Sequence, residues 1–520
     1  MVAMLSSPLR PTHAPLYAPS KPAPHAVPRV WDRSMDDLLL EVRRLFEAPL
    51  RADKLFAMSA GLQEQYHQKL QSSNICMLPS YNHVLPTGCE QGTYLALDVG
   101  GSTLRIALVD LEGKESRHNG MHIRRISTCV IDDRVRSLRG HAFFDWMADR
   151  IKEMLAQEHY EAGMEDAALP MGVAWSFPVE YVLITAAVAF AADRSRQTSP
   201  RSGVLLAMGK GFSATHGVQG QDLGDLIMRA CKHKGLNVSM DAIVNDSSAT
   251  LLSQAYRDPS TRLALILGTG TNAAIHLPVS ALSRDKFGSR PQSWHEAANH
   301  VLVNTELSMF GKHVLPTTKW DEQLNATHPL PDFQPLEHLV SGRYLGEIVR
   351  LILVDAVRSA GLFDGELPQG LDEAYGLDTG TIAVFESDQS ATLAAARATF
   401  HAAHPLPRRA PTPPELAFVR QTVQAVSRRA AAYLAAAVHA LWYLRTLAEG
   451  LAPKEETSHV TIACNGSVLE KYPGFRASCQ GFLDQLTALS GAVGGSVALE
   501  MAPESSIFGA AVAVCCLERQ

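Results

Sequence analysis

The sequence predicts an α/β protein built from two related halves. Its 520 residues are enough for two domains. After residue 93, three strand-like segments, an amphipathic helix and another strand follow one another, which is the order of a sheet covered by helices. A second strand and helix series starts near residue 241. Each series contains two apolar runs split by a glycine- and hydroxyl-rich hinge. The two hinges lie about 170 residues apart, which favours two related halves over short tandem repeats.

The elements of the first half follow from local patterns. Residues 1–35 are rich in proline and are predicted to form a disordered, partly polyproline tail. Residues 36–71 show helical periodicity, and a loop with prolines follows. Strands are then expected at 94–111, interrupted by the first hinge, at 122–131 and from residue 171, with a helix over 143–159.

The second half repeats this logic and adds long helices. Residues 240–256 are predicted to form a strand, a polar turn and a helix, and residues 261–278 form two apolar runs around the second hinge. Helices are expected over 341–361 and 415–450. A last strand within 459–473 and a helix beginning near Gly509 close the chain.

Composition excludes several classes of protein. The net charge of −6 argues against a nucleic-acid binder, which is usually basic. The eight cysteines are scattered without metal-binding spacing, which is typical of reduced thiols in the cytosol. The longest apolar stretch, at 182–192, is too short to span a membrane. We therefore expect a cytoplasmic protein without nucleic-acid or membrane partners, as a monomer or homodimer.

The two hinges are candidate phosphate-binding turns. Gly100 and Gly101 let backbone N–H groups approach an anion closely, and Ser102 and Thr103 add hydroxyl donors. A tight hairpin without a ligand also needs paired glycines, so a single hinge is ambiguous. The second hinge, at 268–271, repeats the composition in a matching position and favours phosphate binding. Neither hinge is a Walker loop or a Rossmann fingerprint, and both are predicted to be hairpins.

Two aspartates stand at strand ends. Asp98 precedes Gly100, and a buried carboxylate there needs a partner, such as Mg²⁺ with its waters; a turn or capping role is the alternative. Asp246 follows another strand and suits the base that transfer of a phosphoryl group to an alcohol requires. The alternative for Asp246 is a helix N-cap.

Together these stretches resemble the hexokinase family over residues 36–516. The resemblance is carried by "LALDVGGSTLR" (95–105), "WSFPVE" (175–180), "GKGF" (209–212), "VNDS" (244–247), "LGTGTN" (267–272), "NTELSMFG" (304–311), "SGRYLGE" (341–347), "CNGSVLEKYP" (464–473) and "PESSIFGAA" (503–511). It implies an actin-like, ribonuclease H-like fold with two lobes around a sugar and ATP cleft. Residues 36–92 would pack on the large lobe, 93–245 would form the small lobe, and 246–516 the large lobe with the ATP site.

The resemblance also implies roles for individual residues. Mg-ATP would phosphorylate a sugar 6-hydroxyl, with Asp246 and Lys210 as catalytic residues and Asp98 reaching Mg²⁺ through water. The sugar would be held by Ser176, Lys210, Asn245, Asp246, Asn272, Glu306 and Glu347. ATP would be held by Asp98, Gly100, Gly101, Ser102, Thr103, Arg105, Gly268, Thr269, Gly270, Thr271, Gly466, Ser467, Ser506 and Gly509.

Departures from the glucose-specific pattern bear on the sugar. Ser102-Thr103 replaces Thr-Asn, Gly209 replaces the threonine before the lysine, and Leu307-Ser308 replaces Trp-Gly. Residues 505–508 replace Gly-Ser-Gly-Lys. This set resembles fungal N-acetylglucosamine kinases, and we expect that sugar. The alternatives are a glucose, mannose or fructose kinase of glycolysis, and a catalytically weak sugar-sensing regulator.

Residues 181–196 interrupt the family pattern. The segment is apolar and stands beside the expected sugar cleft, and the pattern is continuous without it. One hypothesis is that it is translated intron sequence. The other is a genuine insert that covers the cleft and weakens catalysis by hindering closure.

Overall fold

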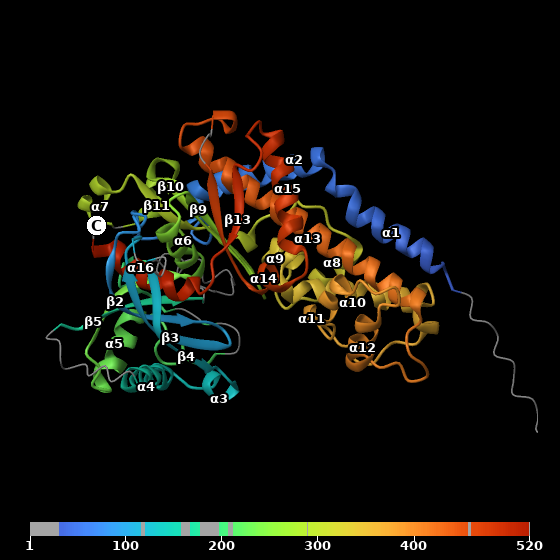
Figure 1. Ribbon diagram of the computed structural model, residues 1–520, viewed down its shortest axis with the longest axis horizontal. Helices are drawn as coiled ribbons and strands as arrows, with labels where there is room; N and C mark the ends of the chain where they lie inside the picture. The colour runs from blue at the N-terminus through green and yellow to red at the C-terminus, as the bar shows by residue number, and fades with distance from the viewer. Residues whose placement is uncertain are drawn as a thin grey trace, which may run out of the picture.

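Two β-sheets organise the molecule into two lobes (Figure 1). The computed structural model describes residues 31–115, 120–157, 167–176, 197–205, 208, 212–288, 290–455 and 459–518. The proline-rich stretch 1–30 and the proposed insert at 181–196 lie outside the described residues, so the hypotheses about them stay predictions. The sheets are mixed, and the α/β class predicted from the sequence is confirmed.

The first lobe is built on a five-stranded sheet of order β4-β3-β2-β5-β8. β2, β3 and β4 are antiparallel, whereas β2, β5 and β8 are parallel. One face is covered by two amphipathic helices whose apolar residues enter the core with the strands. The bounds are β2 (Gln91–Val99), β3 (Thr103–Glu112), β4 (Met121–Val130), β5 (Leu169–Trp175), β8 (Val238–Asn245), α4 (His141–Gln157) and α5 (Leu223–His233).

The other face of this sheet is covered by the C-terminal helix α16 (Ser505–Glu518). A Cβ added at Gly172 in β5 would lie 2.0 Å from the carbonyl oxygen of Ala510, so only glycine lets the helix approach the strand. The same helix packs on α6 (Asp246–Arg257), which leads into the second lobe. The sequence predicts residues 246–516 as the large lobe, and α16, at the end of that range, packs both on the small-lobe sheet and on α6.

The second lobe contains a six-stranded sheet of order β1-β11-β10-β9-β12-β13. β1, β11, β10 and β9 are antiparallel and β9, β12 and β13 are parallel, so each lobe has an antiparallel hairpin followed by parallel strands. The bounds are β1 (Leu78–Pro79), β9 (Thr261–Leu267), β10 (Thr271–Pro278), β11 (His300–Asn304), β12 (Val460–Asn465) and β13 (Val497–Met501).

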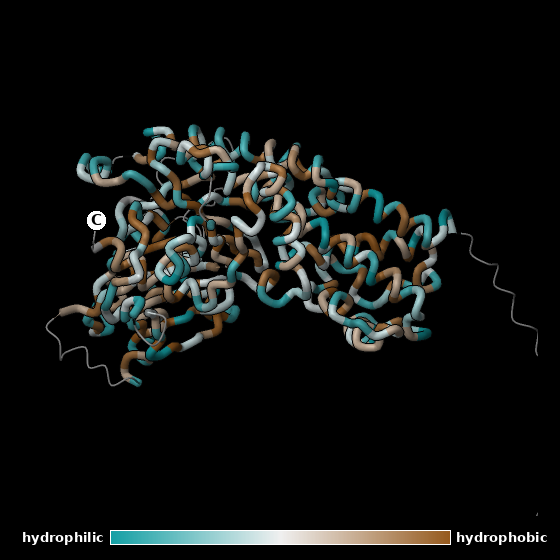
Figure 2. The backbone as a smooth tube through the Cα atoms, turned by 45° about the horizontal axis from the view of Figure 1, so that its top comes forward, coloured by the Kyte–Doolittle hydropathy of each residue, from teal (hydrophilic) through white to brown (hydrophobic). Residues whose placement is uncertain are grey.

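A helical layer extends this lobe, centred on the 36-residue helix α13 (Pro413–Ala448). Most of α13 is buried, and Figure 2 shows hydrophobic stretches in the interior of this helical part. No helix among the described residues is long and apolar enough to cross a membrane. The helices that pack here include α1 (Met35–Glu47), α2 (Ala52–Ser72), α8 (Lys319–Thr327), α9 (Pro335–Val340), α10 (Gly342–Ser359), α11 (Thr379–Ser387), α12 (Ala394–Ala403), α14 (Ser467–Lys471) and α15 (Phe475–Leu489). Short elements complete the chain: β6 (Gln197–Ser199), β7 (Ser202–Gly203), α3 (Asp133–Arg136) and α7 (Gln292–Ala297).

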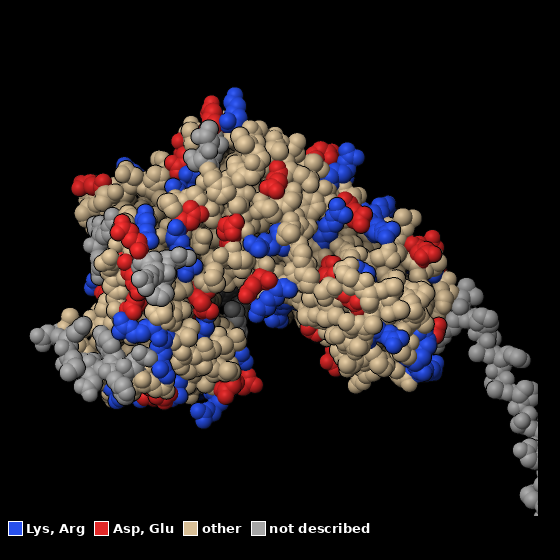
Figure 3. Space-filling model, viewed as in Figure 1, with Lys and Arg blue, Asp and Glu red and all other residues tan. Residues whose placement is uncertain are grey.

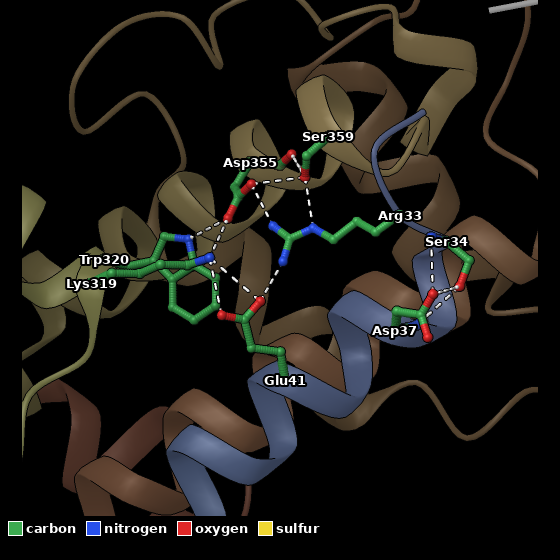
Figure 4. Close-up of polar contacts among 8 residues, drawn as sticks. All are labelled: Arg33, Ser34, Asp37, Glu41, Lys319, Trp320, Asp355 and Ser359. Atoms are coloured by element: carbon green, nitrogen blue, oxygen red, sulfur yellow. Dashed lines mark hydrogen bonds and ion pairs between the residues drawn. The ribbon is translucent and has the colours of Figure 1, made fainter. Parts of the chain in front are cut away.

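The first described residues fasten α1 to this layer (Figure 4). The guanidinium of Arg33 bonds Asp355 at 2.7 Å and also pairs with Glu41, and Lys319 bonds the same two carboxylates at 3.1 and 3.2 Å. Ser34 caps α1 by accepting from the backbone N–H of Asp37. The helical pattern predicted from residue 36 is thus present, with its N-terminus fixed by a charge cluster.

Candidate active site

The first glycine hinge is a hairpin between β2 and β3. The backbone N–H of Gly100 donates to the carbonyl of Thr103 at 3.0 Å, and the strands pair antiparallel on both sides. Ser102 is exposed at the tip, and its carbonyl accepts from Ile131 at 2.8 Å. Ser176 lies beside this hairpin, because its N–H donates to the carbonyl of Val99 at 3.2 Å. The predicted hairpin is confirmed.

Asp98 has an arginine partner across the hairpin. The register places Arg105 opposite Asp98, and the guanidinium donates to one carboxylate oxygen at 2.6 and 3.0 Å. The same guanidinium bonds Glu504 at 2.7 Å, just before α16. Burial raises the pKa of Asp98, and the charge of Arg105 opposes that shift. The sequence leaves open what offsets the burial of this carboxylate, and the structure supplies Arg105.

The second glycine hinge is a hairpin between β9 and β10. Gly268 N–H donates to the carbonyl of Gly270 at 2.9 Å. The N-terminus of α10 contacts its tip: Gly342 N–H donates to the carbonyl of Gly268 at 2.8 Å, and the Ser341 hydroxyl to that of Thr269 at 2.9 Å. This second predicted hairpin is also confirmed, and the start of α10 donates hydrogen bonds to two of its carbonyl groups.

The start of α14 also packs on the second hairpin. Gly466 has φ +109°, and a Cβ there would lie 2.3 Å from the carbonyl oxygen of Leu267. Ser467 is the neighbour nearest to Gly268, since a Cβ at Gly268 would lie 3.6 Å from its backbone nitrogen. The structure therefore brings residues 268–270, 341–343 and 466–467 together, as expected for Gly466 and Ser467.

Between the hairpins, amide side chains form a hydrogen-bonded cluster. Asn272 Nδ2 donates to Asn304 Oδ1 at 2.9 Å and, more weakly, to Asn245 Oδ1 at 3.4 Å. Asn304 Nδ2 donates to Glu306 Oε1 at 2.8 Å. Asn245 is the N-cap of α6, so Asp246 occupies the first helical position and is half-buried. The alternative role for Asp246, the N-cap of the helix, is therefore filled by its neighbour Asn245. Asn304 joins the set that sequence reasoning singled out.

Glu306 is a buried carboxylate of this cluster with a strongly raised pKa. Its backbone has φ +52°, a left-handed conformation that is uncommon for a residue other than glycine. Burial raises the pKa of Glu306 to about 7, Asn304 opposes the shift, and the charges of Asp246 and Glu337 add to it. Three carboxylates, Asp246, Glu306 and Glu337, are therefore close enough to interact.

The second glutamate of the cluster is Glu337, not Glu347. Glu337 Oε2 accepts from the Thr271 backbone N–H at 3.0 Å, on the second hairpin. The Glu347 carboxylate is held by Arg350 at 2.6 and 2.7 Å and by the backbone N–H of Tyr375 at 2.6 Å. The structure thus places Glu347 in a buried ion pair and not in the amide cluster, and its sugar contact stays a prediction. The sequence signal for this ion pair is Arg350. It lies three residues after Glu347 on the same helix, and this spacing favours an intrahelical ion pair.

The remaining predicted residues divide between site and scaffold. Ser506 is half-buried at the N-terminal turn of α16. Gly509 is buried, and a Cβ there would lie 1.9 Å from the carbonyl oxygen of Ala249 in α6. Gly509 therefore serves helix packing in this structure, and its ATP contact stays a prediction. Gly209 and Lys210 lie outside the described residues. The face in Figure 3 is hollowed between the lobes, with acidic and basic side chains around the hollow.

Two lobes, each with a glycine hairpin, define an actin-like ATPase fold with a polar cluster between the hairpins. Family models described as hexokinase match residues 42–256 and 262–516. The chain belongs to the hexokinase family.

Known relatives match nearly the whole chain. Hexokinase-7 of Oryza sativa subsp. japonica is 31% identical over 456 residues, covering 88% of this chain and 90% of that protein. Hexokinase-2 of Candida albicans is 28% identical over 476 residues, covering 91% and 90%. The solved structure of hexokinase from Schistosoma mansoni complexed with glucose is 28% identical, with a TM-score of 0.73, and covers 93% of this chain and 100% of that one. These relatives indicate a hexose kinase.

Proposed function

We propose that the chain transfers the γ-phosphoryl group of ATP to the 6-hydroxyl of a hexose. The observation that carries the proposal is the cluster of Asn245, Asp246, Asn272, Asn304, Glu306 and Glu337 beside two glycine hairpins. A sugar presents a ring of hydroxyls that are both donors and acceptors, and paired amides and carboxylates satisfy both. The hairpins supply backbone N–H groups for the phosphates.

Asp246 is the proposed general base. It is half-buried at the start of α6, and one carboxylate oxygen accepts from the Ser247 backbone N–H at 2.8 Å. That bond and the N-terminus of α6 favour the ionised carboxylate, which can accept the proton of the attacking hydroxyl. Glu306 and Glu337 would orient the sugar by accepting from its other hydroxyls.

Asp98 fits the proposed Mg²⁺ site. Mg²⁺ in phosphoryl-transfer sites is usually held by one or two carboxylates together with waters and phosphate oxygens. A single buried carboxylate suits this pattern, and the residues that the structure describes contain no group of three His, Cys, Asp or Glu that could form a protein cage. Asp98 would hold the ion through water, and bound Mg²⁺ would neutralise charge on the phosphates. Arg105, beside Asp98, would face the same phosphates.

The relatives favour glucose, mannose or fructose as the sugar, because those reported above are named hexokinases. N-acetylglucosamine is the second candidate. The observation in its favour is that Leu307 and Ser308, which replace Trp-Gly, are buried directly beside Glu306, where they change the packing behind the sugar cluster. Gly209 adds to it, since a missing threonine side chain would leave room for an acetamido group.

The test is ADP release by the full chain with each sugar in turn. Turnover of glucose, mannose or fructose is the expected result. Turnover of N-acetylglucosamine alone would transfer the assignment to the second candidate, and Gly209→Thr should then reduce it. ADP release with none of the sugars would overturn the kinase and favour a sugar-binding regulator.

A further inference from the structure

Arg343 connects the second glycine hairpin to the aromatic ring of Tyr375. Its backbone contacts the hairpin and its side chain contacts the ring. The backbone N–H of Arg343 donates to the carbonyl of Thr269 in that hairpin at 3.2 Å. The guanidinium carbon of Arg343 lies 5.0 Å from the centroid of the Tyr375 ring, and the Tyr344 ring lies 6.0 Å from it between centroids in a T-shaped arrangement. Arg343 is exposed and Tyr375 is half-buried, so the pair stands at the rim of the site.

The loop that carries Tyr375 is held in a strained conformation. Tyr375 has φ +60°, which favours glycine, yet the chain places a large aromatic residue there. Its backbone N–H is fixed by Glu347, and Arg350 holds Glu347 and also donates to the carbonyl of Leu371 at 2.7 Å. A buried ion pair thus fixes the backbone of Tyr375, whose half-buried ring packs against the edge of the hydrophobic core.

Arg343, which contacts the Tyr375 ring, and the sugar cluster contact different residues of the second hairpin. Glu337 contacts the hairpin at Thr271, next to Asn272, whereas Arg343 contacts it at Thr269, next to the glycine that meets α14. A nucleotide whose phosphates occupy the hairpins, with its last phosphate towards Asn272, would extend its base past Thr269. A flat aromatic ring capped by a guanidinium is a suitable surface for a base.

We infer that Tyr375 is a specificity-determining residue that stacks on the base of the bound nucleotide, with Glu347 as its positioning residue. This inference rests on the proposed function, in which the hairpins hold ATP. Arg343 covers the ring in the ligand-free chain and moves aside when the base takes its place. The ring adds affinity for the base only, so it discriminates nucleoside triphosphates from triphosphate alone.

The decisive variant is Tyr375→Gly. Its binding of MgATP and of Mg-tripolyphosphate is measured by calorimetry on the full chain without sugar. Glycine suits φ +60°, so the variant should fold as well as the wild type. We expect MgATP to bind about tenfold more weakly, the usual effect of losing one base-stacking ring, with tripolyphosphate binding unchanged. Tyr375→Phe should restore MgATP binding, because the ring and not the hydroxyl is required.

The matched control is Tyr81→Ala, which removes another tyrosine that lies under an arginine, Arg290, at 4.5 Å. It should leave both ligands unaffected. Glu347→Gln should weaken MgATP in the same direction as Tyr375→Gly. Equal weakening of MgATP and tripolyphosphate by Tyr375→Gly, or unchanged MgATP binding, would overturn the inference. Because binding is read without turnover, a chain that binds MgATP but phosphorylates no sugar would refute the proposed kinase and not this role of Tyr375.

Discussion

Glu337 Oε2 accepts a hydrogen bond from the backbone N–H of Thr271 at 3.0 Å, which joins α9 to the second glycine hairpin. A Cβ at Gly270 would lie 2.6 Å from the same oxygen, so the carboxylate rests directly on the turn. One side chain therefore connects the proposed sugar cluster with the proposed phosphate-binding hairpin, whereas Glu347, ten positions later, lies in a separate ion pair.

Glu337→Gln should change the KM for the sugar, whereas Glu347→Gln should change the free energy of unfolding. Loss of the Glu337 charge should raise the KM for the sugar about tenfold or more, since hydrogen bonds to a charged acceptor contribute strongly. Glu347→Gln should leave the sugar KM unchanged and lower the free energy of unfolding by about 3 kcal/mol, because Arg350 loses a buried partner. Steady-state kinetics and urea denaturation measure the two effects. A raised sugar KM in Glu347→Gln would restore the role that the sequence predicted for it.

Asp246→Asn should lower kcat by about 10²- to 10⁴-fold, the usual contribution of a general base. Asparagine can accept the same bond from the Ser247 N–H, so the start of α6 should stay intact and the Tm should change little. The KM values for sugar and ATP should also stay close to those of the wild type. If the variant kept its kcat and lost stability instead, Asp246 would be a structural residue of the helix terminus.

The sequence predicts the hairpins well because their signal is local. Paired glycines and hydroxyls between two apolar runs leave few alternatives, and Gly100 and Gly268 make the expected turns. The sequence does not show which glutamate of "PLEHLVSGRYLGE" faces the hairpin, because a tertiary contact decides it. The sequence also does not predict the packing at Gly509. The neighbour that requires a glycine there is Ala249 in α6, 260 positions earlier.

Glu306 should make the stability of the ligand-free chain fall as the pH rises. Its pKa is about 7 in the folded chain against an ordinary value of 4.5, so between these pH values the folded state retains a proton that the unfolded state has lost. The cost of ionising the buried carboxylate grows through this window and is complete above pH 7, where it amounts to about 3 kcal/mol.

Glu306→Gln removes that cost. The variant should unfold at a higher urea concentration than the wild type at pH 8, and the difference should vanish below about pH 4, where the Glu306 carboxyl of the wild type is protonated in both the folded and the unfolded state. Gln can still accept from Asn304, so the fold of the cluster is preserved. The sugar KM should rise at the same time. An equal effect on stability at both pH values would show that the Glu306 charge is not the cause.

Gly509→Ala tests whether this glycine serves packing or the nucleotide. Its Cβ would lie 1.9 Å from the Ala249 carbonyl oxygen, and backbone cannot yield as a flexible side chain can. We expect the free energy of unfolding to fall by about 3 kcal/mol, as for other overpacked interiors. Gly481→Ala is the matched control, because Gly481 is exposed within α15 with no atom near the added Cβ, and it should gain about 0.5–1 kcal/mol from helix propensity. A raised ATP KM with unchanged stability in Gly509→Ala would return Gly509 to the nucleotide site.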